Sequence, residues 1–152
     1  MRRAIRLFVL FEGTAFITAA LTHFGILMKG YEHQKAGTAE SVIGIVLLCG
    51  LMLTWIRPAS TRGIGLAVQA FALFGTLVGI FTIVIGVGPR TAPDIAYHFV
   101  IVIVLVCGLV AAARARALHR ADKFRIHHRM AKVACKTLDK CVDSAPRHST
   151  YW

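Results

Sequence analysis

The chain has 152 residues, of which 57% are hydrophobic and only 16% are charged, and its formal net charge is +11. Such a composition lies outside the usual range of soluble domains and indicates a membrane protein. The sequence has no CxxC pair, no nucleophile with a base at a motif spacing and no phosphate-binding glycine loop, so it supports no specific enzyme class.

Four apolar segments are each about long enough to cross roughly 30 Å of hydrocarbon at about 1.5 Å per residue. Long, continuously apolar runs favour helices, because a membrane-spanning strand alternates over about ten residues. The sequence therefore predicts an all-α fold, in which a four-transmembrane-helix bundle over residues 1–113 precedes a basic cytoplasmic tail over 114–152. We expect the four helices at 4–28, 40–56, 63–88 and 94–113.

The distribution of basic residues predicts the orientation. Fifteen of the 18 Lys and Arg residues fall at the start, in the connection around Arg57 and Arg62, or in the tail; the other three are Lys29, Lys35 and Arg90. By the positive-inside rule, both termini are cytoplasmic and the chain resides in the cytoplasmic membrane. The opening MRRAIR is retained, because the apolar stretch behind it is too long for a signal peptide and lacks a small-x-small cleavage site.

Two polar residues of the first and third segments, Glu12 and Gln69, lie at similar depths from the cytoplasmic side, so we expect them to meet inside the bundle. One interpretation is a structural hydrogen bond between helices, worth on the order of 0.6 kcal/mol. The other is a protonatable carboxyl that takes part in proton movement or contacts a bound headgroup.

Nearer the outer face, four ionisable residues share one level: His23, Glu40, Asp94 and His98. Asp94 and His98 are one helical turn apart, so the carboxylate can accept a hydrogen bond from the imidazole and set its tautomer. Glu40 and Asp94 each open an expected helix, where a carboxylate suits the free backbone donors. Capping explains neither His23 nor His98, which lie about a turn or more inside the boundary. The sequence therefore predicts a ligand-binding site formed by all four.

Two imidazoles and two carboxylates could bind zinc, iron or copper, donate hydrogen bonds to a quinone carbonyl, or relay a proton. Metal sites in helix bundles often use Glu-x-x-His repeats on paired helices, and this sequence has none. A metal site is therefore disfavoured, haem bound by His23 and His98 still more so, and a quinone is the cofactor we consider.

The third segment contains GTLVG, in which Gly75 and Gly79 form a smooth strip that lets another helix approach closely. The partner is either a helix of this chain or one of a second copy, so homo-oligomerisation stays open.

In the tail, a basic stripe adjoins an apolar one and predicts a helix lying on anionic lipids, at about 1 kcal/mol per nearby basic residue. No nucleic-acid recognition motif accompanies it, and we expect disorder beyond about residue 143. The stripe consists of Arg125, Arg129, Lys132, Lys136 and Lys140.

The segment AESVIGIVLLCGL, with Glu40, Gly44 and Gly50, follows a first helix that ends near a histidine. This pattern over about residues 4–112 resembles the DoxX-like group of small bacterial membrane proteins. The resemblance implies a four-helix bundle in the cytoplasmic membrane and, in some members, association with quinone-linked sulfur oxidation or other redox complexes. PDIAYH and the basic tail have no counterpart in that pattern.

We therefore expect a membrane subunit that supports redox chemistry by holding a quinone-like or lipid ligand, with His98 oriented by Asp94 and His23 as the opposing donor. Two alternatives are a small proton-coupled transporter or channel component, with Glu12 and Gln69 on its path, and a scaffold that recruits a cytoplasmic partner through the basic tail. The sequence leaves open whether the protein is an enzyme, and a redox partner subunit is a further expected contact.

Overall fold

The computed structural model describes residues 2–88 and 90–114. The helix expected in the tail, its basic stripe and its disordered end lie outside these residues. Four helices, each long and apolar enough to cross a membrane by length and composition, make up the described part, which contains no strand. They are α1 (Arg2–His23), α2 (Gln34–Ile56), α3 (Thr61–Val84), preceded by the short 3₁₀ helix η1 (Pro58–Ser60), and a fourth helix at Ala92–Arg114.

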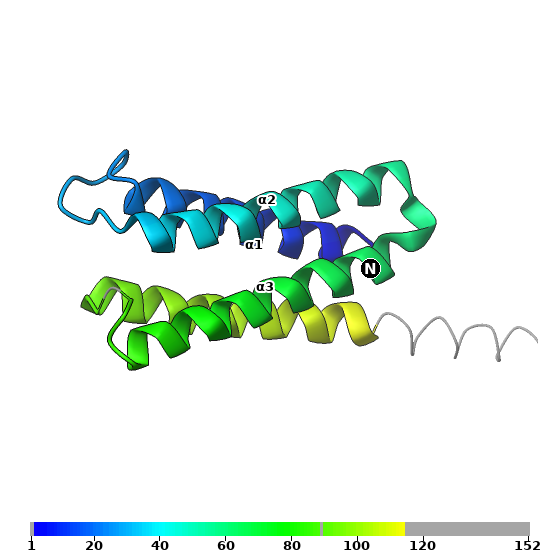
Figure 1. Cartoon of the computed structure of the whole chain (residues 1–152). Coiled ribbons are helices and arrows are strands. Elements are labelled where there is room, and N and C mark those ends of the chain that lie inside the picture. Colours follow the sequence, from blue (N-terminus) through cyan, green and yellow to red (C-terminus); the bar gives the residue numbers. More distant parts are fainter. Residues whose placement is uncertain (1, 89, 115–152) are drawn as a thin grey trace, which may run out of the picture. The chain divides into compact units, whose positions relative to one another are not determined.

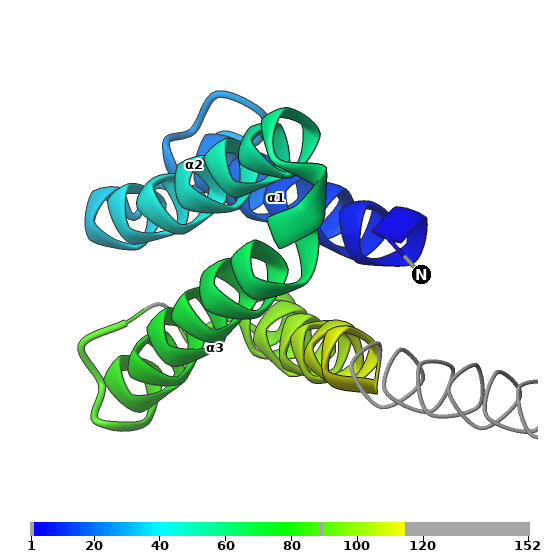
Figure 2. The ribbon, with the colours of Figure 1, turned by 90° about the vertical axis from the view of Figure 1, so that its right-hand side faces the viewer.

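Successive helices run in opposite directions, so the bundle has two distinct ends (Figure 1). α1 and α2 form one layer, and α3 and the fourth helix, drawn in yellow-green to yellow, form the other; the view along the bundle in Figure 2 agrees. The N-terminus and η1 lie at one end, and residues 24–33, which join α1 to α2, lie at the other. We call the latter the loop end.

The helix boundaries differ from the expected ones at the loop end. α1 stops at His23 instead of residue 28, because Gly25 adopts a φ of 72°, a left-handed conformation that favours glycine and that a helix does not contain. α2 begins six residues earlier than expected, at Gln34. α3 ends at Val84, where Gly86 (φ 86°) terminates the helix.

Small residues allow the helices to pack closely. A Cβ atom added to Gly50 of α2 would lie 2.6 Å from Val68 Cγ1 of α3, and one added to Gly75 would lie 2.7 Å from Ile43 Cδ1 of α2. A Cβ on Gly79 would lie 3.3 Å from His98 Nε2. The strip of Gly75 and Gly79 therefore packs against helices of the same chain.

At the end opposite the loop end, two arginines bind backbone carbonyls near helix C-termini, where the last carbonyls lack partners within the helix. Arg6 of α1 donates to Thr54 O at 2.6 Å and to Thr54 Oγ1 at 3.2 Å, and its guanidinium lies 4.5 Å from the centre of the Trp55 ring. Arg62 donates to Ala112 O at 3.1 Å. These contacts join α1 to α2 and α3 to the fourth helix.

The outer surface of the bundle is apolar along its length. Large hydrophobic side chains are exposed on every helix, including Phe11, Trp55, Phe74 (68% exposed) and Phe99 (69%). Water-soluble monomers rarely expose contiguous apolar surface of this extent.

The contact between Gly50 and Val68 predicts a difference between two glycine substitutions. Val68 is β-branched and stiff, so the methyl of Gly50→Ala forces α2 and α3 apart, and we expect a loss of about 1–3 kcal/mol. A Cβ added to Gly63 of α3 meets no atom within 4 Å, so Gly63→Ala should gain up to about 1 kcal/mol from helix propensity. Thermal unfolding of both variants in detergent measures the difference, and equal midpoints would contradict this packing.

Candidate functional site

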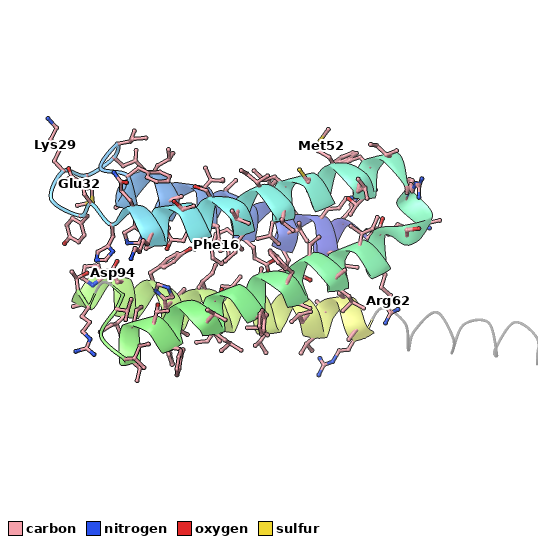
Figure 3. The ribbon with its side chains drawn as sticks, in the orientation of Figure 1. Phe16, Lys29, Glu32, Met52, Arg62 and Asp94 are labelled. Atoms are coloured by element: carbon pink, nitrogen blue, oxygen red, sulfur yellow. The ribbon has the colours of Figure 1, made fainter. Side chains whose placement is uncertain are left out.

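The imidazole ring of His23 lies between two carboxylates at the loop end. Its Nδ1 is 2.7 Å from Glu40 Oε2 of α2, and its Nε2 is 3.0 Å from Asp94 Oδ1 of the fourth helix. All three residues are buried, with exposed fractions of 4%, 5% and 7%. Figure 3 shows Asp94 at the same end of the bundle as Lys29 and Glu32. The structure thus joins three of the four predicted site residues into one cluster, which we call the His23 triad.

The geometry of the His23 triad restricts where its protons lie. A carboxylate only accepts hydrogen bonds, so each ring nitrogen must carry a hydrogen unless the facing carboxyl is itself protonated. If His23 is doubly protonated and both carboxyls are ionised, the triad carries a net charge of −1. In the other arrangement, one ring proton resides on Glu40 or Asp94 instead, the ring is neutral, and the net charge is again −1. Either way, the triad is a proton-holding group shared by three helices.

Asp94 has a second role at the start of its helix. The Thr91 hydroxyl donates to Asp94 Oδ2, and the backbone N–H of Asp94 points back to Thr91 Oγ1 at 3.4 Å. The pair is a variant of the capping box in which the Thr91 hydroxyl, and not its backbone N–H, bonds the acid; its signal in the sequence is the threonine three positions before the acid. Thr91 was not among the residues predicted for the site. Capping does not account for Glu40, because α2 begins at Gln34 and Glu40 lies in its second turn.

His98 is placed differently from the expectation. The expected hydrogen bond from its ring to the Asp94 carboxylate is wrong: Nδ1 of His98 is 2.8 Å from the backbone oxygen of Asp94, while the carboxylate faces His23 and Thr91. A helical carbonyl one turn earlier is within easy reach of an imidazole, and the carboxylate finds stronger partners on the other side. His98 therefore lies beside the triad without joining it.

A first cavity of about 520 Å³, which we call the α1 cavity, runs along α1 beside the start of the fourth helix. The threonine hydroxyls of this cavity donate to backbone carbonyls of α1: Thr18 to Thr14 O at 2.9 Å and Thr22 to Thr18 O at 3.0 Å. The wall is consequently apolar except at the loop end, where His23 and Asp94 lie. The lining residues are Phe11, Thr14, Ala15, Thr18, Ala19, Thr22, His23, Met28, Tyr31, Pro93, Asp94 and Tyr97.

A second cavity of about 220 Å³, the α3 cavity, lies between α2, α3 and the fourth helix. His98 and Glu40 line this cavity, whereas His23 and Asp94 line the α1 cavity, so the four predicted residues do not share one pocket. The lining residues are Phe16, His33, Lys35, Ala36, Ala39, Glu40, Ile43, Gly75, Thr76, Val78, Gly79, Thr82, Ile83, Val87, Gly88 and His98.

Tyr97, which was not predicted as a site residue, lines the α1 cavity. Its ring packs edge-on against Phe16, with 6.3 Å between ring centres, and against His98 at 5.3 Å. Its hydroxyl and Glu40 Oε1 are both buried and have no hydrogen-bond partner. An aromatic among apolar neighbours gives no signal in the sequence, because its partners come from other helices.

Glu12 and Gln69 meet in the middle of the bundle, as expected from their depths. Gln69 Nε2 lies 3.0 Å from each carboxyl oxygen of Glu12, and both side chains are fully buried. Gly108 of the fourth helix lies against this pair, since a Cβ there would be 2.6 Å from Glu12 Oε1 and would overlap Gln69 Nε2. Neither Glu12 nor Gln69 lines the α1 or the α3 cavity.

Within residues 2–88 and 90–114, no group of three or more His, Cys, Asp or Glu side chains is arranged to hold a metal ion. Comparisons of the chain with protein-family models, with curated proteins and with solved structures find no match.

The His23 triad predicts a large effect of removing its ring. His23→Ala leaves two buried carboxylates facing each other without a shared proton donor, so we expect a loss of about 3–5 kcal/mol in unfolding free energy. His33→Ala is the control, because His33 precedes α2 and makes no side-chain cap bond. Denaturant or thermal unfolding in detergent measures both, and equal stability of the two variants would be incompatible with the triad.

The contact at Gly108 predicts coupling between two sites. Gly108→Ala should cost about 1–3 kcal/mol, because the new methyl displaces the Glu12–Gln69 pair. In a Gln69→Ala background the closest of these contacts is gone and the Glu12 side chain can move into the vacated space, so the same change should cost at least about 1 kcal/mol less. A double-mutant cycle of unfolding free energies measures this coupling, and additive effects would refute the contact.

Proposed function

We propose that the protein is a multi-pass subunit of the cytoplasmic membrane that supports redox chemistry by holding a quinone-like or lipid ligand in the α1 cavity. The main support for this proposal is the shape of the α1 cavity, an apolar groove along α1 that ends at the polar side chains of His23 and Asp94. The redox part of the proposal rests on the DoxX-like resemblance.

The membrane setting is supported by the four apolar helices and by the hydrophobic side chains on the outside of the bundle. Hydrocarbon chains are the natural solvent for that surface. Arg2, Arg3, Arg57 and Arg62 belong to the end of the bundle opposite the loop end. By the positive-inside rule, that end and the N-terminus face the cytoplasm, and the His23 triad lies near the outer leaflet.

The α1 cavity suits an elongated amphiphile. From Phe11 to Thr22 it follows α1 for roughly 16 Å, at about 1.5 Å per residue, and the threonine methyls and alanines of α1 line it. A prenyl or acyl chain fits this wall, because the hydroxyls of Thr18 and Thr22 are bonded within α1 and present their methyl-bearing side chains without a free donor. The headgroup then lies at His23, Asp94 and Tyr31. Because lipid tails are as apolar as this wall, van der Waals packing of the chain and the polar contacts of its headgroup supply the binding energy.

The polar end favours some headgroups over others. Both ring nitrogens of His23 already face carboxylates, so His23 has no free donor for a quinone carbonyl. Asp94 presents lone pairs, which a hydroxyl or ammonium group can satisfy. We therefore propose that the bound form is a hydroxyl-bearing, quinol-like head or a lipid with a hydroxyl or ammonium headgroup. Such a ligand would supply any electron chemistry, while the residues of this chain hold its head and exclude water.

The transporter alternative has less support. Glu12 and Gln69 bond to each other and line neither cavity, which favours a structural pair over a proton or solute path. The scaffold alternative depends on the tail and so on residues outside the described part. A second copy or a redox partner subunit stays part of the proposal, because the exposed apolar faces of the helices offer room for one.

Filling the α1 cavity tests the proposal. Thr18→Trp places a bulky ring across the middle of the groove, and we expect the amount of co-purified amphiphile to fall by on the order of tenfold. Native mass spectrometry of detergent-purified protein, followed by solvent extraction, identifies the ligand as quinone or lipid.

Thr38→Trp is the matched control, since Thr38 is also exposed and its hydroxyl also donates to the carbonyl one turn earlier, at 2.8 Å, but it lines neither cavity. The proposal fails if the wild type neither carries nor binds an amphiphile, or if Thr18→Trp and Thr38→Trp retain equal amounts.

A further inference from the structure

The polar groups that line the α3 cavity include two threonine hydroxyls of α3. Thr76 and Thr82 line it, and each hydroxyl donates its proton to a carbonyl of its own helix: Thr76 to Ala72 O at 2.8 Å and Thr82 to Gly79 O at 2.7 Å. A hydroxyl that has given away its proton offers only lone pairs to a ligand. These two threonines are therefore acceptors towards the cavity.

Two ionisable residues that line the α3 cavity, His98 and Glu40, are acceptors as well. His98 Nδ1 lies 2.8 Å from the backbone oxygen of Asp94, which can only accept, so Nδ1 carries the hydrogen and the favoured tautomer has its lone pair on Nε2. Glu40 is 95% buried and bonds His23 through Oε2, while its Oε1 has no partner. An unpartnered carboxylate oxygen at this depth is costly unless a donor satisfies it.

The net charge of the His23 triad also favours a cationic donor in the α3 cavity. With His23 doubly protonated, the triad carries a net charge of −1, and in the described residues neither Glu40 nor Asp94 is paired with Lys or Arg. A buried, uncompensated negative charge is strongly unfavourable, so a positive charge nearby stabilises the cluster. Glu40 is the member of the triad that lines the α3 cavity.

We propose that the α3 cavity binds a small primary ammonium cation, held by Glu40, His98, Thr76 and Thr82. The chemistry fits because an ammonium group brings three N–H donors and one positive charge to a wall of acceptors next to a negative cluster. The size fits because about 220 Å³ accommodates a few groups the size of water, whose share of the liquid is about 30 Å³. The exposed Lys35 and the half-buried His33 lie at the loop-end side of the cavity, so the cation enters from water.

The test uses the full-length protein in detergent with methylammonium chloride as the probe. Tetramethylammonium chloride at the same ionic strength is the comparison salt, because it has the same charge, no N–H donor and a larger volume. We expect methylammonium to raise the thermal midpoint in a saturable manner and tetramethylammonium to leave it unchanged. Saturation-transfer NMR on the methylammonium methyl group should report the same binding.

Two variants locate the site. Glu40→Gln removes the charge, and Thr76→Val removes one acceptor at almost constant volume. We expect the affinity for methylammonium to fall by on the order of tenfold or more in Glu40→Gln and by a smaller factor in Thr76→Val. Thr38→Val is the matched control, because the Thr38 hydroxyl also bonds its own helix but Thr38 lines neither cavity; its affinity should match the wild type.

Several results would overturn the proposal. Equal responses to the two salts would show that no donor-specific site exists, and an unchanged affinity in both Glu40→Gln and Thr76→Val would place binding elsewhere. Binding that appears only in Lys35→Gln would show that the Lys35 side chain itself fills the cavity. Absence of any saturable response would indicate that a proton neutralises the triad. None of these outcomes depends on an amphiphile in the α1 cavity, so they leave the proposed function to its own test.

Discussion

The bridge that His23 makes between Glu40 and Asp94 is the interaction on which the loop end of the bundle depends. It joins the end of α1 to the second turn of α2 and to the first turn of the fourth helix. In an apolar bundle, few other directional contacts are available there to fix the positions of three helices. A buried bridge of this kind tolerates little displacement, because moving any helix leaves a charged group without a partner.

Members of the same bridge line both cavities, His23 and Asp94 the α1 cavity and Glu40 the α3 cavity. On one side, back-bonded threonines make the α1 cavity an apolar groove that ends at His23 and Asp94. On the other side, back-bonded threonines and the His98 tautomer give the α3 cavity an inner wall of acceptors next to Glu40. The threonine oxygens have different neighbours in the two cavities. In the α3 cavity they lie in the same lining as Glu40, whose Oε1 has no partner, so together they form a site that requires a hydrogen-bond donor.

Close packing keeps the polar residues in place elsewhere in the bundle. Gly50 lets α2 approach Val68 of α3, and Gly108 gives the Glu12–Gln69 pair the space that a side chain would occupy. Glycine weakens a helix in water, but between apolar helices it permits close contact and so compensates through packing. Glu12 and Gln69 join α1 to α3 at mid-depth, while Arg6 and Arg62 secure helix ends at the side opposite the triad.

The sequence by itself determined the four helices, the similar depths of Glu12 and Gln69 and the common level of His23, Glu40 and Asp94, because a fixed rise per residue converts chain position into depth. Only the tertiary structure decided the partners at that level: the Asp94 carboxylate bonds His23, and His98 lines a different cavity. It also set the ends of α1 and α3, through Gly25 and Gly86 with positive φ. Depth follows from one helix alone, whereas the direction in which a side chain points across the bundle depends on how all four helices rotate and pack against one another.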